Sequence, residues 1–156
     1  MADCQDPAVV LMSIKPQWAD AIMSGRKRVE FRCARFGRVV SHVVVYATSP
    51  VQRVVGFFEV RDITEAEPTM LWEMFAAVGD IGEAAFADYY AGKVEGVAIH
   101  VGQVTRLAEP AMLAEVVPGA IAPQSYRYAD PRVIPELTRR ASSRNGDCAS
   151  CGMVFA

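Results

Sequence analysis

Long apolar runs are missing from this chain of 156 residues. No stretch of about 18 uncharged apolar residues occurs, and a helix needs roughly that length to cross a membrane. The first residues, Met1 to Asp6, also lack the basic start and the apolar segment of a secretory signal. We therefore expect a cytoplasmic protein that does not span a membrane.

Cysteine and histidine are scarce, with four and two residues respectively. So few cysteines in a cytoplasmic chain of this size do not indicate a disulfide framework. Cys148 and Cys151 have the C-x-x-C spacing of half a zinc site, but a second such pair is missing. They also do not follow a strand of a βαβ unit, as a thioredoxin-like redox pair would. We expect no metal and no cofactor.

Signatures of several large enzyme classes are absent as well. The chain has no glycine-rich phosphate loop, no zinc-deaminase signature and no Ser–His–Asp order. His42 opens one predicted strand and His100 lies within another, positions where a histidine is more often structural than catalytic. These absences argue against dinucleotide-binding, kinase and serine-hydrolase activities.

The chain does have an apolar content of 52%, which is enough to bury the core of one domain. Apolar and alternating runs predict strands at residues 9–14, 28–32, 42–47, 53–60 and 97–104. Helical spacing predicts helices at 16–25, in two parts over 68–91, and at 111–116. Residues 123–128 are predicted to form an exposed loop.

The order of these elements predicts an α+β fold, because strict βαβ alternation is absent. Five strands with short helices inserted between them favour a small mixed β-barrel. From about Arg139 the chain becomes small and polar. We therefore expect one domain over residues 1–138 and a flexible C-terminal tail over residues 139–156.

The net charge is only −2, but it is distributed unevenly. Residues 26–38 carry six cations against Glu30 alone, whereas residues 63–100 carry seven acids against Lys93. A basic segment on a mildly acidic protein can attract a phosphate-bearing ligand. The acidic segment, residues 65–95, is a candidate surface for a protein partner. A well-mixed solvated surface is the alternative for both segments.

Reactive side chains are densest between residues 13 and 32. Glu30 and Arg32 lie two residues apart on one predicted strand, so they share a face and are about 7 Å apart. Arg32 should hold Glu30 ionised, because a neighbouring cation lowers the pKa of a carboxyl group. Lys27 lies at the corner between helix and strand, and Lys15 precedes the helix N-terminus, a position suited to a phosphate. A surface ion pair with solvated lysines is the alternative.

Aromatic side chains are candidates for stacking on a nucleobase, which contributes about 1–3 kcal/mol per base. Trp18 lies on the apolar face of its helix, where core packing competes with stacking. The strand of Tyr46 leads directly into the polar residues Thr48 and Ser49. The segment Y-R-Y that begins at Tyr126 alternates aromatic and basic residues in a predicted loop, a pattern that favours ligand binding.

Three groups of motifs follow one another along the chain. The first is S-I-K-P-x-W-A-x-x-I-x-x-G-x-K-x-x-E-F-R over residues 13–32. The second comprises Y-A-T-S-P at 46–50 and V-V-G at 54–56, and the third is P-Q-S-Y-R-Y at 123–128. Together, over roughly residues 9–130, they resemble the ASCH domain family of the PUA-like superfamily of small β-barrels.

The resemblance implies that the chain binds RNA or a nucleotide in a cleft lined by Lys27, Glu30 and Arg32, in the regulation of transcription or RNA metabolism. Combined with the aromatic and polar candidates, the predicted binding residues are Lys15, Trp18, Lys27, Glu30, Arg32, Tyr46, Thr48, Ser49, Gln124 and Tyr126.

An enzyme is the alternative that the resemblance leaves open. Some members resemble amidohydrolases that deacetylate a modified cytidine with Lys, Thr and Glu, but Glu30 stands where those enzymes place the threonine. Thr48 or Ser49 would have to replace it. Other members resemble ribonucleases, in which case Lys27 would supply charge and Glu30 would take the proton of a 2′-hydroxyl.

Overall fold

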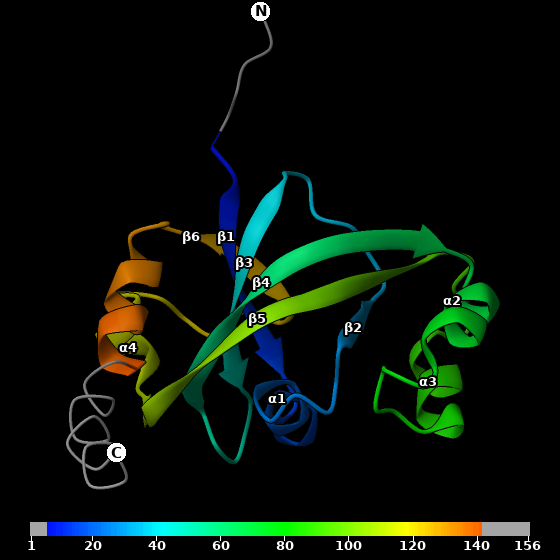
Figure 1. Ribbon diagram of the computed structural model, residues 1–156, viewed down its shortest axis with the longest axis horizontal. Coiled ribbons are helices and arrows are strands. Elements are labelled where there is room, and N and C mark those ends of the chain that lie inside the picture. Colours follow the sequence, from blue (N-terminus) through cyan, green and yellow to red (C-terminus); the bar gives the residue numbers. More distant parts are fainter. Residues whose placement is uncertain (1–5, 142–156) are drawn as a thin grey trace, which may run out of the picture.

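Six strands form one mixed sheet in the computed structural model, which describes residues 6–141 (Figure 1). The strands are β1 (Ala8–Ile14), β2 (Val29–Arg32), β3 (Val40–Ala47), β4 (Arg53–Ala66), β5 (Gly96–Ala111) and β6 (Tyr126–Ala129). Their order across the sheet is β2-β5-β4-β3-β1-β6. β1 and β3 pair in parallel, and the other pairings are antiparallel. The α+β class is confirmed.

β2 and β6 are the two edges of the sheet, so the sheet is not closed into the predicted barrel. Side chains connect these edges instead. Arg32 Nη2 donates a hydrogen bond of 2.5 Å to Ser125 Oγ, and the Phe36 ring packs edge-to-face on Tyr126 with centroids 4.8 Å apart. We call this line of contact the β2–β6 seam; it is formed by Arg32, Phe36 and Arg38 on one side and by Ser125, Tyr126 and Tyr128 on the other.

The inner face of the curled sheet packs on α1 (Pro16–Met23). Val10 and Met12 of β1 alternate into this core, which also contains Ile22 of the helix. Pro16 suits the first turn of α1 because its missing N–H would be unpaired there. Gly25, with φ of 85°, turns the chain just beyond the helix so that β2 can follow.

The outer face of the sheet is covered in two places. α2 (Pro68–Phe75) and α3 (Glu83–Tyr89) cover β2 and β5, with Leu71, Phe86 and Phe31 in their core. α4 (Leu113–Val116) and a helix over residues 133–141 contribute to the core over β1 and β3, where Leu137 is fully buried. Figure 1 shows these two groups of helices at opposite ends of the molecule.

Several elements differ from the prediction. β4 and β5 are longer than expected, because they continue as one antiparallel pair up to the inserted helices. The predicted loop at 123–128 is wrong in part, since Tyr126–Ala129 pairs with β1 as a strand. The helix at 133–141 was not predicted, and the boundary at residue 138 stays a prediction. Cys148, Cys151 and residues 142–156 lie outside the described part of the chain.

Two further findings apply to residues 6–141. No helix there is long and apolar enough to cross a membrane. No group of three or more His, Cys, Asp or Glu side chains there is arranged to hold a metal ion. The acidic segment, residues 65–95, includes the end of β4 and both α2 and α3, and its role in binding a protein partner stays a prediction.

Candidate functional site

A pocket of about 730 Å³ lies where the ends of β1 and β3 meet α1, β2, α3 and the segment just before β6. We call it the Glu30 pocket. Its lining side chains include Lys15, Trp18, Glu30, Arg32, Tyr89 and Gln124. Two hollows of similar size, about 810 and 760 Å³, border the loop at residues 33–39, but their charged side chains are all exposed. Only the Glu30 pocket, among these three, reaches a buried charged group.

Local structure explains how distant residues meet in this pocket. β1 carries Ser13 to the pocket, and the helix that begins at Pro16 presents Trp18 in its first turn. Ser13 also holds the segment before β6 in place. Its N–H donates to the Ser125 carbonyl at 2.9 Å, and its hydroxyl donates to the Pro123 carbonyl at 2.6 Å. Gln124 and Ser125 are thereby brought beside β2.

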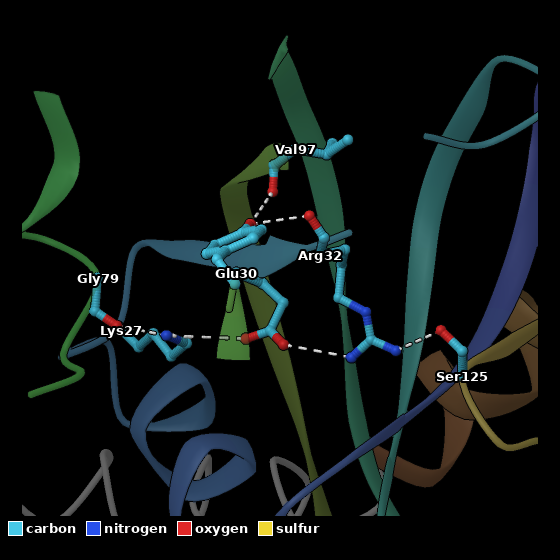
Figure 2. Close-up of polar contacts among 7 residues, drawn as sticks. Lys27, Glu30, Arg32, Gly79, Val97 and Ser125 are labelled. Carbon is cyan, nitrogen blue, oxygen red and sulfur yellow. Dashed lines mark hydrogen bonds and ion pairs between the residues drawn. The ribbon is translucent and has the colours of Figure 1, made fainter. Parts of the chain in front are cut away.

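Glu30 lies between two cations (Figure 2). Arg32 Nη1 is 3.5 Å from Glu30 Oε1, and Lys27 Nζ is 3.8 Å from Glu30 Oε2. Lys27 and Glu30 are only 2% and 3% exposed, and the Lys27 ammonium donates to the carbonyl of Gly79. Glu30 Oε2 is buried and has no hydrogen-bond partner among residues 6–141. The carboxyl group therefore keeps unused acceptor capacity inside the protein.

Burial dominates the ionisation of this pair. It raises the pKa of Glu30 above its usual range, and the nearby Lys27 and Arg32 only partly oppose it. Burial likewise lowers the pKa of Lys27, against the attraction of Glu30. The expectation that Arg32 lowers the Glu30 pKa is therefore wrong overall, because strand alternation reveals a neighbouring cation but not the loss of water around the carboxyl group.

Six of the ten predicted binding residues line the Glu30 pocket, and they differ in exposure. Lys15 and Gln124 are exposed, Trp18, Arg32 and Thr48 are half-buried, and Glu30 is buried. The Lys15 ammonium is 5.3 Å from the centroid of the Trp18 ring, and the Lys27 ammonium is 5.9 Å from it. An indole ring and two cations are thus grouped at one end of the sheet.

The other four predicted residues do not line the pocket. Lys27 lies behind Glu30 and touches it from the protein interior. Tyr46 is buried in the outer-face core, Ser49 is exposed outside the pocket, and Tyr126 packs in the β2–β6 seam. Lys27 therefore does not line the pocket itself and is connected to it through Glu30 and the Trp18 ring.

Sequence reasoning missed several lining residues, including Ser13, Gln17, Asp88, Tyr89 and Ser125. Burial raises the pKa of Tyr89, which adds to the preference of its hydroxyl for the protonated form. Asp88 and Tyr89 lie in α3, far from β2 in the sequence, and helical spacing alone does not show which residues of that helix approach Glu30. Ser125 lies within a quoted motif, but its contact with Arg32 depends on the curl of the sheet.

Fold and site together define a small α+β domain with a polar and aromatic pocket at one end of a curled sheet. The model of the ASCH domain matches residues 12–110, which is more than half of the chain. The protein therefore belongs to the ASCH domain family.

Individual relatives agree with this assignment. An ASCH domain-containing ribonuclease of Zymomonas mobilis is 31% identical over 99 residues, which cover 63% of this chain and 67% of the relative. The crystal structure of ASCH from Zymomonas mobilis has a TM-score of 0.78 at 27% identity, covering 86% of this chain and 96% of that one. The N-terminal domain of Staphylothermus marinus McrB shares the fold, with a TM-score of 0.53 at 9% identity over 87% of this chain and 96% of that one.

Proposed function

We propose that the protein binds single-stranded RNA and holds one nucleotide in the Glu30 pocket. The observation that carries this proposal is the grouping, in one pocket, of an aromatic ring, the cations Lys15 and Arg32, and the buried carboxyl group of Glu30, whose Oε2 accepts no hydrogen bond from the described residues. The name of the Zymomonas mobilis relative, a ribonuclease, supports RNA as the ligand.

Each part of a nucleotide has a matching group in the pocket. The half-buried Trp18 ring offers a surface on which a base can stack. Lys15 and Arg32 can pair with a phosphate, the arginine by its fixed pattern of donors. Glu30 and Gln124 can form hydrogen bonds with a base edge or a sugar hydroxyl. A single-stranded ligand is favoured because the base must be unstacked to enter.

Lys15 provides the test of this pocket. We expect Lys15→Ala to weaken binding of a nucleoside monophosphate by about fivefold, because one exposed phosphate contact contributes up to about 1 kcal/mol. Binding should quench the fluorescence of Trp18, and Trp18→Phe should remove that signal. The matched control is Lys93→Ala, which removes an exposed lysine outside the pocket. Equal affinity in both lysine variants, or an unchanged quench in Trp18→Phe, would contradict the proposal.

Cleavage of the bound RNA is a second candidate, favoured by the buried Glu30 carboxyl group, whose Oε2 accepts no hydrogen bond from the described residues, and by the name of the relative. In this reaction Glu30 takes the proton of a 2′-hydroxyl, the 2′ oxygen bonds to the adjacent phosphorus, and the bond to the 5′ oxygen breaks. The 5′ oxygen takes a proton from water. The products are a 2′,3′-cyclic phosphate and a 5′-hydroxyl. Lys27 would be a positioning residue that supports the charge of Glu30.

Glu30→Gln separates binding from cleavage. It preserves the shape of the side chain but removes the base, and general acid–base catalysis contributes about 100- to 10,000-fold. If the protein cleaves RNA, turnover should fall by at least about 100-fold while affinity changes little. The measurement is release of cyclic-phosphate ends from a labelled oligonucleotide. No turnover by the wild-type protein, or equal turnover in Glu30→Gln, contradicts this second candidate and leaves binding as the function.

A further inference from the structure

The β2–β6 seam carries a cation outside the Glu30 pocket. The Arg38 guanidinium lies 5.0 Å from the centroid of the Tyr128 ring. Contact with a ring holds a guanidinium in place, while the N–H groups at its edge remain able to bind an anion. Arg38 is exposed, and no carboxylate of the described residues forms an ion pair with it. It is therefore a positioned cation without an acidic partner.

The other cations of residues 26–38 are placed differently. Arg26, Arg32 and Arg35 each have a carboxylate oxygen at 3.9 Å or less, and Lys27 is buried. Arg28 has no ion pair among the described residues, but it lines a separate hollow of about 210 Å³ with Phe75 and His100. Arg38 is thus the unpaired exposed cation of this segment that lies at the β2–β6 seam.

We propose that an RNA strand with one nucleotide in the Glu30 pocket continues along the β2–β6 seam and places a second phosphate on Arg38. This inference rests on the proposed function. Tyr128 is three residues beyond Ser125, which lines the pocket, and three residues of extended chain span about 10 Å. A single strand covers that distance in about three stacked nucleotides, at about 3.4 Å each. A mononucleotide is therefore too short to reach Arg38 from the pocket.

Arg127 provides a matched control on the same strand. Tyr126 and Tyr128 pack against the inner-face core, whereas Arg127 pairs across β6 and β1 with Leu11 of the outer-face core. Successive side chains of a strand point to opposite faces, so Arg127 points away from the seam. It is exposed like Arg38, and its loss changes the net charge by the same amount.

The experiment compares ligand lengths by calorimetric titration. The ligands are the four nucleoside monophosphates and a single-stranded RNA octamer of mixed sequence. We expect Arg38→Ala to weaken binding of the octamer by about fivefold. The plot of log affinity against log salt should become shallower by about 0.7, because one phosphate contact is lost. Monophosphate binding should be unchanged, and Arg127→Ala should leave both affinities unchanged.

Three results overturn the inference. The first is an octamer affinity that Arg38→Ala does not change, and the second is an equal loss in Arg127→Ala, which assigns the effect to net charge. The third is an equal loss of monophosphate and octamer affinity in Arg38→Ala, which places Arg38 in the pocket itself. In each of these cases the proposed function still stands if the wild-type protein binds a monophosphate and Lys15→Ala weakens that binding. If the wild-type protein binds neither the monophosphates nor the octamer, both proposals are overturned.

Discussion

The ionisation of Glu30 depends on two opposing effects, its burial and the two cations beside it. The Arg32 guanidinium lies 3.5 Å from Glu30 Oε1, and the Lys27 ammonium lies 3.8 Å from Glu30 Oε2. Both distances exceed those of strong charge-assisted hydrogen bonds, which are about 2.7–2.9 Å. The loss of hydration therefore outweighs the attraction, and the pKa of Glu30 rises.

This raised pKa predicts a characteristic dependence of stability on pH. Within the window from about pH 4.5 up to the raised pKa, the folded state binds more protons at Glu30 than the unfolded state does. The contribution of Glu30 to the free energy of unfolding therefore decreases as pH rises through that window. Glu30→Gln cannot titrate, so its stability relative to the wild type should increase with pH.

Denaturant unfolding of both proteins between pH 4 and 8 measures this difference. The remaining carboxyl groups are common to the two proteins, so their titration largely cancels. Lys27 loses a charged partner in the variant and its pKa falls further, which adds to the same trend. A relative stability that is flat or decreases with pH would show that the Glu30 pKa is not raised in the folded state.

At the scale of elements, the chain after β5 contributes more to the fold than its composition suggests. β6 has only four residues, yet it pairs with β1 and supplies the aromatic side of the β2–β6 seam. The helix at residues 133–141 then packs Val133 and Leu137 onto the outer face of the sheet. Both elements lie beyond the 12–110 match to the ASCH domain.

Leu137→Ala tests whether this last helix is part of the cooperative fold. Leu137 is 0% exposed, and truncation of a buried leucine to alanine costs about 2–5 kcal/mol. We expect a loss of unfolding free energy in that range by denaturant titration. Thr138→Ala is the matched control, because Thr138 is exposed on the same helix and should change stability by about 0.5 kcal/mol or less. Equal small effects of the two substitutions would mean that the helix is not docked cooperatively.

At the scale of the whole molecule, the curl of the sheet creates the site. Arg32 at the end of β2 and the loop after it contact Ser125, Tyr126 and Tyr128 at the seam, and the Glu30 pocket opens at one end of that line of contact. Arg32 and Arg38 consequently lie beside Ser125 and Tyr128, while α2 and α3, which belong to the acidic segment, cover the outer face of β2 and β5. Although the net charge is only −2, cations lie at the seam and acidic residues are concentrated in the segment that forms α2 and α3. This distribution of charge suits an anionic ligand bound along the seam.

Most of the local elements could be predicted from the sequence. Apolar and alternating runs identified β1 to β5, and Pro16 with Gly25 marked the ends of the first helix, because these signals act within a few residues of the chain. The ordered motifs also pointed to the ASCH domain family, which the 12–110 match confirms. The sequence pattern did not predict the short strand β6 or the helix at 133–141, since their pairing and packing partners lie far away in the sequence.

Which candidate residues form a site, and how they ionise, depends on long-range packing that the sequence pattern does not reveal. Lys27 contacts Gly79 across 52 positions, and Arg32 contacts Ser125 across 93. Neither contact leaves a local pattern. The same long-range packing removed water from Glu30 and reversed the direction expected for its pKa, and it moved Tyr46 and Tyr126 into apolar packing away from the pocket. Periodicity reports which face of an element a side chain occupies, whereas burial and proximity depend on where the other elements pack.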